Sequence, residues 1–111
     1  MNIGKVLYKD ALIITMEGDL IGENVGPDIL EVVNDAIENE SKKVIIDLNG
    51  IRYMNSSGIG VLITVHSKMK NIGGQVVLVN PNEEIVKILE LTKLSQVFTI
   101  EKSIEVAKES L

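Results

Sequence analysis

The sequence of 111 residues contains no cysteine, no tryptophan and a single histidine, His66. Without cysteine, this chain has no disulfide, no thiolate zinc site, no iron–sulfur cluster and no cysteine nucleophile. A single histidine also excludes a metal site built on a histidine pair, and any catalytic triad would have to use His66. We therefore expect no metal site, although a purely carboxylate site stays open.

Aromatic residues are scarce, at 3% of the chain, and comprise only Tyr8, Tyr53 and Phe98. Modules that bind nucleic acids by base stacking depend on aromatic platforms that this chain lacks. The 16 acidic residues outnumber the 11 basic ones, so the formal net charge is −5. Because phosphate contacts from Lys and Arg supply most nucleic-acid affinity, we expect no direct nucleic-acid partner.

Long apolar runs are also missing. No stretch reaches 18 apolar residues, and Lys5, Lys9 and Asp10 interrupt the N-terminal segment where a signal peptide would need its apolar centre. We expect no membrane partner and a cytoplasmic location.

What the chain does contain is a high proportion of hydrophobic residues, 45%. A chain of this length is expected to form one domain, covering residues 1–111, which buries about 65% of its unfolded surface. Because aromatics are few, its core must consist mainly of Ile, Val and Leu. Such a core suits a sheet that is covered by helices.

Hydrophobic periodicity divides the chain into alternating short strands and amphipathic helices. Two β-prone runs at 3–8 and 11–17, separated by Lys9-Asp10, predict an antiparallel hairpin. The elements expected after it are a helix over 24–40, a strand over 44–48, a helix over 57–72, a strand over 76–79, a helix over 83–91, a strand over 97–100 and a helix over 103–110.

The alternation of strands and helices after the hairpin implies parallel neighbouring strands with right-handed crossovers. The sequence therefore predicts an α/β fold in the order β-β-α-β-α-β-α-β-α, with a mixed sheet of about five strands and four helices, mostly on one side. Pro27 is expected in the first turn of its helix. Asn49-Gly50 is expected to form a turn after the strand at 44–48.

The segment Tyr-Met-Asn-Ser-Ser-Gly-Ile-Gly at residues 53–60 is the most informative for function. Asn55 is a suitable N-cap, because its side-chain oxygen can accept a hydrogen bond from a free amide of the first helical turn. Ser56 and Ser57 then lie in that turn, where backbone amides lack partners and the helix dipole is positive. A phosphate on Ser56 would be favourable to the helix and would add about two negative charges.

The residues that follow the serines are compatible with two interpretations. From Ile59 onward, the first half of this helix is apolar on nearly all sides, which is typical of a helix that is buried or partly exposed for a partner. Gly58 and Gly60 would allow either a partner protein or a neighbouring strand to approach the backbone closely. Serines at helix starts also commonly serve only as caps, so a purely structural role stays open.

This motif resembles the signature of STAS domains, in particular bacterial anti-sigma factor antagonists of the SpoIIAA/RsbV type. The resemblance covers essentially the whole chain. It is carried by Asp47-Leu48, Met54-Asn55-Ser56-Ser57-Gly58-Ile59-Gly60-Val61-Leu62, Gly18-Asp19-Leu20, Gly73-Gly74, Asn80-Pro81 and Leu91-Thr92-Lys93-Leu94 before Val97-Phe98.

The resemblance implies a protein that is not an enzyme and that acts as a phosphorylation-controlled binding partner. In such antagonists, an anti-sigma factor that is also a serine protein kinase phosphorylates a serine in an Asp-Ser-[Ser/Thr]-Gly motif. The unphosphorylated antagonist binds the anti-sigma factor and frees the sigma factor for transcription. Phosphorylation breaks the complex, and a phosphoserine phosphatase restores binding.

Carried onto this chain, the resemblance makes Ser56 the phosphorylation site. The partner-binding loop would comprise Asp19, Asn55, Ser57, Gly58, Ile59 and Gly60.

Two positions depart from the family pattern. Asn55 stands where the antagonists usually have Asp, and Ile21 stands where many have Asp. Both departures remove a negative charge near the serine, and Asp19 is a candidate to replace it.

These departures favour an alternative function, a constitutive STAS interaction or scaffold module, for example one associated with transport, whose serine is never phosphorylated. An enzyme is a third hypothesis, but the sequence shows no base paired with a nucleophile and no cofactor motif, so we expect no cofactor. Asp47 is expected to bond to nearby amides, and His66 to be a packed or rim side chain.

Overall fold

The computed structural model describes residues 2–109, which form one five-stranded sheet in the order β1-β2-β3-β4-β5. Only the β1–β2 hairpin is antiparallel, and each later pair is parallel, so the predicted mixed sheet is confirmed. The strands are β1 (Asn2–Tyr8), β2 (Ala11–Leu20), β3 (Lys43–Met54), β4 (Gln75–Val79) and β5 (Thr99–Glu101).

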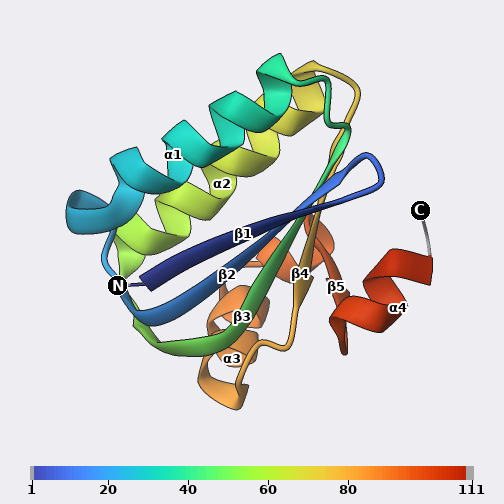
Figure 1. Cartoon of the computed structure of the whole chain (residues 1–111). Helices are drawn as coiled ribbons and strands as arrows, with labels where there is room; N and C mark the ends of the chain where they lie inside the picture. Colours follow the sequence, from blue (N-terminus) through green and yellow to red (C-terminus); the bar gives the residue numbers. More distant parts are fainter. Residues whose placement is uncertain (1, 110–111) are drawn as a thin grey trace.

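Four α-helices cover the sheet, and the predicted order of strands and helices is confirmed. A short 3₁₀ helix, η1 (Leu94–Gln96), precedes β5. In Figure 1, α1 and α2 run side by side across one face of the sheet. The helices are α1 (Gly22–Glu38), α2 (Ser56–Asn71), α3 (Glu83–Leu91) and α4 (Ile104–Glu109).

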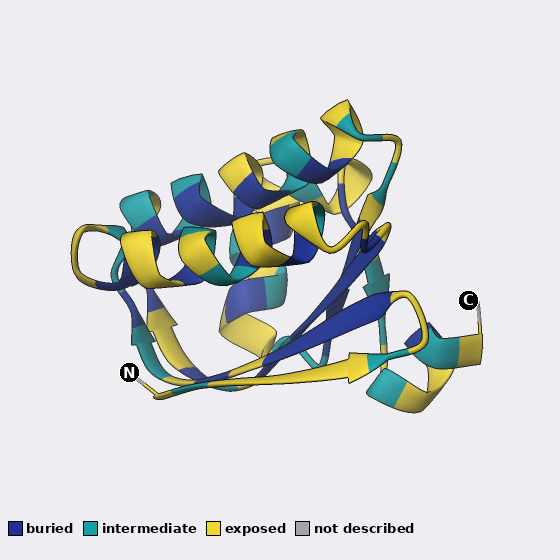
Figure 2. Cartoon of the chain, turned by 45° about the horizontal axis from the view of Figure 1, so that its top comes forward, coloured by how far each residue is buried: buried dark blue, intermediate teal, exposed yellow. Residues whose placement is uncertain are grey.

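Side chains alternate along the central strands between two aliphatic clusters. Leu12, Ile14 and Met16 of β2 join the larger cluster under α1, α2 and α3. Ala11 and Ile13 point to the other face, where Ala107 of α4 belongs to the smaller cluster. Figure 2 shows the buried sides of α1 and α2 turned toward the sheet, while β1 is largely exposed. The sheet is therefore covered mainly on one side, as predicted.

The predicted turn at Asn49-Gly50 is wrong, because both residues lie within β3, which continues to Met54. The neighbouring strand β2 also continues, to Leu20, and provides backbone pairing partners over this length, with shifts in register. At Gly50, a Cβ would lie 2.5 Å from the backbone oxygen of Met16. The glycine therefore marks a close approach of two strands at a β-bulge and not a turn.

Two further boundaries differ from expectation. Helix α1 begins at Gly22, so Pro27 lies in its second turn and not in the first. There Pro27 leaves the carbonyl of Glu23 without its usual helical donor. The final strand is Thr99–Glu101 instead of 97–100, since η1 occupies the chain just before it. The last helix was predicted over 103–110, and residue 110 lies outside the described residues.

Candidate functional site at the start of helix α2

The segment that joins β3 to α2 lies beside the segment that joins β2 to α1. The backbone amide of Asn55 donates to the carbonyl oxygen of Leu20 (3.3 Å). The side-chain oxygen of Asn55 accepts a hydrogen bond from the amide of Gly58 (2.8 Å), which confirms the predicted N-cap of α2. Two helices therefore begin next to each other at one end of the sheet (Figure 1).

Ser57 links the two helix starts. Its Oγ accepts a hydrogen bond from the amide of Gly22 at the start of α1 (3.1 Å). The same Oγ lies 2.7 Å from Oε2 of Glu23 and 2.9 Å from Oδ1 of Asn55. A hydroxyl has one proton to donate, and the carboxylate is both the nearer and the charged acceptor. Ser57 is therefore a structural residue that fastens α1 to α2.

Ser56 has a different environment. It is the first residue of α2 and is exposed. Within residues 2–109, no hydrogen bond engages its hydroxyl. The two adjacent serines thus divide into one that is held by α1 and one whose hydroxyl faces solvent. Of these two serines, only Ser56 can accept a modifying group without breaking a hydrogen bond within the described chain.

Glu23 is a member of the site that sequence reasoning missed. Its Oε2 receives hydrogen bonds from Ser57 Oγ and, at 3.4 Å, from Nδ2 of Asn55. The Ser57 hydroxyl, followed by the backbone amide of Glu23 itself and the Asn55 amide, lowers the pKa of Glu23 below its ordinary value. An acid in the first turn of a helix is visible in sequence. The contact with Ser57 is not visible, because it depends on how α1 and α2 lie together.

The Glu23 carboxylate supplies a negative charge beside this loop, at a residue that the sequence analysis did not name. The side chain of Asp19, the candidate that it did name, pairs with Arg52. Asp19 is paired in register with Tyr53, and its Oδ1 lies 3.5 Å from a guanidinium nitrogen of Arg52. Among the hydrogen bonds of the described chain, none joins Asp19 to the two serines.

The two glycines of the motif have different environments. Gly58 is buried, and a Cβ there would lie 2.2 Å from the carbonyl oxygen of Leu20. This glycine is explained by packing against β2. At Gly60, a Cβ would meet nothing within 4 Å. Of the two alternatives left open by the sequence, packing therefore accounts for Gly58, and Gly60 leaves the helix surface bare.

An exposed strip follows from this placement and is called here the α2 surface. It consists of Ser56, Ile59, Gly60 and Ile63, whose spacing of three to four residues puts them on one side of a helix. Ile59 is half-buried, whereas Ile63 is 41% exposed. The strip combines a free hydroxyl with one exposed and one half-buried aliphatic side chain and a glycine.

The remaining polar candidates have structural roles. Oδ1 of Asp47 accepts a hydrogen bond from the amide of Asn49 (2.9 Å), as expected. The ring of His66 meets the ring of Phe98 edge-on, with 5.3 Å between centroids, so of the packed or rim positions expected, His66 has the packed one. Within residues 2–109, no group of three His, Asp or Glu side chains is placed to hold a metal ion. The helices of this same part of the chain are all too short or too polar to cross a membrane.

The fold and this site define a small α/β domain in which the exposed Ser56 begins α2 next to the start of α1. Residues 2–107 match the model of the STAS domain, and the chain belongs to the STAS family. STAS antagonists of sigma-factor regulation are generally not enzymes.

Several relatives carry a common description. A Thermotoga maritima protein named as an anti-sigma factor antagonist is 26% identical over 105 residues, which cover 95% of this chain and 93% of the relative. A crystal structure of a Thermotoga maritima antagonist superposes with a TM-score of 0.88 at 25% identity, covering 97% of this chain and 92% of the other. The Bacillus protein SpoIIAA in its phosphorylated form shares the fold, with a TM-score of 0.78 at 17% identity and coverage of 99% and 100%.

Proposed function

We propose that this chain is an anti-sigma factor antagonist that is switched by phosphorylation of Ser56. The observation that carries the proposal is the contrast between the free, exposed hydroxyl of Ser56 and the bound hydroxyl of Ser57. In this proposal, the unphosphorylated protein binds an anti-sigma factor that is also a serine kinase. Phosphorylation of Ser56 releases it, and a phosphoserine phosphatase restores binding. We place this role in the cytoplasm. We assign it to a single STAS domain that covers residues 1–111.

The α2 surface gives the switch its physical basis. Contact with a partner would remove Ile59 and Ile63 from water, which favours binding. A phosphate on Ser56 would add about two negative charges to the same strip, and burying them without a counter-charge would be costly. The ionised carboxylate of Glu23 lies beside the loop and adds like-charge repulsion. The free amides at the start of α2 favour the phosphate, so the switch does not require the domain to unfold.

The other residues of the predicted partner-binding loop support this proposal through their positions around Ser56. Asn55, Ser57 and Gly58 shape the loop through the contacts described above, and Gly60 lets the partner approach the helix closely. A direct contact of Asp19 with the partner stays a prediction.

The test uses the cognate anti-sigma factor kinase, together with ATP and intact-mass measurement. The wild-type chain and a Ser67→Ala control, which changes another exposed serine of α2, should each gain one phosphate. Ser56→Ala should gain none. In a binding assay, Ser56→Ala should keep its affinity for the partner and Ser56→Asp should lose most of it. Equal affinity of these two variants would overturn the switch.

A constitutive scaffold is the second candidate, and Asn55 is the observation that favours it. Its side-chain oxygen caps the amide of Gly58 without the acid that antagonists usually carry there. If the chain is a scaffold, a kinase that is active on its own substrate will add no phosphate to Ser56. Partner binding will then be the same for wild type and Ser56→Asp.

A further inference from the structure

The outer edge of β1 is a second candidate for binding and does not involve Ser56. Strand β1 lies at the end of the sheet, so within residues 2–109 its seven residues pair only with β2. Val6 is 62% exposed and Leu7 is 64% exposed. An edge strand with exposed apolar side chains is a ready template for the addition of another strand.

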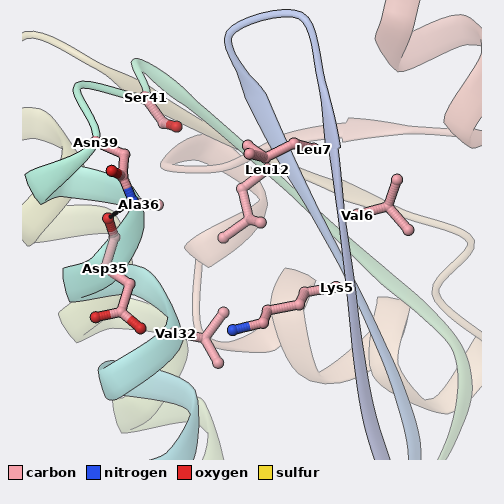
Figure 3. Close-up of a pocket in the computed structure, with 9 residues that line it drawn as sticks. All are labelled: Lys5, Val6, Leu7, Leu12, Val32, Asp35, Ala36, Asn39 and Ser41. Atoms are coloured by element: carbon pink, nitrogen blue, oxygen red, sulfur yellow. Dashed lines mark hydrogen bonds between the residues drawn. The ribbon is translucent and has the colours of Figure 1, made fainter.

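A groove runs between β1 and α1 along this edge. One part is a hollow of about 280 Å³ whose apolar lining includes Leu12, Val32 and Ala36. Figure 3 shows the side chain of Lys5 reaching from β1 toward Val32 of α1, while Val6 points away from the hollow. A second hollow of about 390 Å³ shares Lys5, Val32 and Asp35 with the first. The two hollows therefore adjoin each other between β1 and α1, and together they are called the groove here.

The charge along this groove is strongly one-sided. Helix α1 contains no Lys or Arg, and four of its acids recur at helical spacing on its exposed side. We call them the α1 acidic ridge: Asp28, Glu31, Asp35 and Glu38. The first three line the second hollow, where Lys5 is the single cation. Among the described residues, no cation lies within ion-pair distance of the ridge.

We propose that the groove binds an extended, basic segment of a partner protein. The segment would add to β1 as a further strand, so that its backbone pairs with the free edge. Alternate Lys or Arg side chains would face the α1 acidic ridge, and the small apolar side chains between them would pack near Val6 on the opposite face. Complementary charge fixes the chemistry of the partner and accelerates its association.

A second copy of this chain fits the groove less well. Its own β1 would bring one cation, Lys5, to a ridge of four acids. Each copy also carries a formal net charge of −5, which opposes self-association. The occupant must therefore be more basic than β1.

The probe is the blocked peptide acetyl-Thr-Lys-Val-Lys-Val-Lys-Thr-amide, titrated into the ¹⁵N-labelled full chain and followed by amide chemical shifts. The expected result is that amides of β1 and of the outer side of α1 shift together and that β1 amides exchange more slowly with solvent. A peptide with Glu in place of Lys should not bind. The same peptide with N-methyl groups on one edge should bind much more weakly.

Protein variants test the charge argument. Glu31→Gln combined with Asp35→Asn should weaken peptide binding roughly fivefold, since each exposed charge contributes a modest amount. Glu90→Gln combined with Glu105→Gln removes the same charge from exposed positions of α3 and α4 and should leave the affinity unchanged. Equal weakening by both pairs, or equal binding of the Glu peptide, would overturn the proposal. Shifts of β1 amides that depend on protein concentration alone would overturn it in favour of a second copy.

Discussion

Replacement of Gly58 by alanine should destabilise the protein, while the same replacement at Gly60, two residues further along α2, should stabilise it. At Gly58 the new Cβ would lie 2.2 Å from the carbonyl oxygen of Leu20, well inside contact distance. That oxygen also accepts the amide of Asn55, so the displaced backbone would disturb the cap of α2. At Gly60 the new methyl group meets nothing within 4 Å.

The magnitudes follow from these contacts. Overpacking costs about 1–3 kcal/mol, and a weakened cap adds about 1 kcal/mol. The better helix propensity of alanine raises the free energy of unfolding by about 1 kcal/mol at either position. We therefore expect Gly58→Ala to lower the free energy of unfolding by about 2 kcal/mol and Gly60→Ala to raise it by about 0.5–1 kcal/mol.

The assay is urea unfolding followed by far-ultraviolet circular dichroism, because the chain has no tryptophan to report by fluorescence. The difference between the two variants is the decisive quantity, since helix propensity cancels from it. If Gly58→Ala and Gly60→Ala have the same unfolding midpoint, the close approach of α2 to β2 is not what requires glycine, and the reasoning fails.

Three other changes test the site and the helix ends. Asn55→Ala should lower the free energy of unfolding by about 1 kcal/mol in the same assay, whereas Asn55→Asp keeps the capping oxygen and should raise the pKa of Glu23 in an NMR titration. The folded state lowers the pKa of Glu23, so its stabilisation is present above the ordinary glutamate pKa and is lost as pH falls through the folded value. Glu23→Gln should therefore flatten the dependence of the urea midpoint on pH in that acidic range, and an unchanged profile would contradict the Ser57 contact. Glu40, two residues after the end of α1, has a φ of 62°, so Glu40→Gly should raise the free energy of unfolding by about 1 kcal/mol. Gly73 has a φ of 75°, so Gly73→Ala should lower it by a similar amount, and the opposite signs would refute this.

Local chemistry explains why the start of α2 could be predicted from sequence. Asn55 caps the amide of Gly58 three residues ahead of it, an interaction that needs only a helix and a suitable side chain. Asn82 caps α3 and Ser103 caps α4 in the same way, with acceptor oxygens 2.9 Å and 3.2 Å from the amide nitrogens they serve. The alternation of apolar residues in β2 is likewise a local property of a strand, and it determines which side chains face α1.

Contacts between distant segments could not be predicted. Glu23 meets Ser57 across 34 residues of sequence, and the separation is closed only because β2 and β3 are parallel neighbours that end side by side. Gly50 resembles a turn residue when only its neighbours in sequence are considered. Glycine is required at this position because the backbone of Met16 on the adjacent strand lies so close, and sequence spacing does not reveal that contact.

The positions of the two serines decide what kind of switch this domain can be. A phosphate on Ser57 would have to displace the amide of Gly22 and the carboxylate of Glu23, and would thereby separate α1 from α2. A phosphate on Ser56 breaks no hydrogen bond within the described chain and changes only the charge of the α2 surface. In the proposed switch, modification of Ser56 would therefore reverse partner binding while the fold is unchanged.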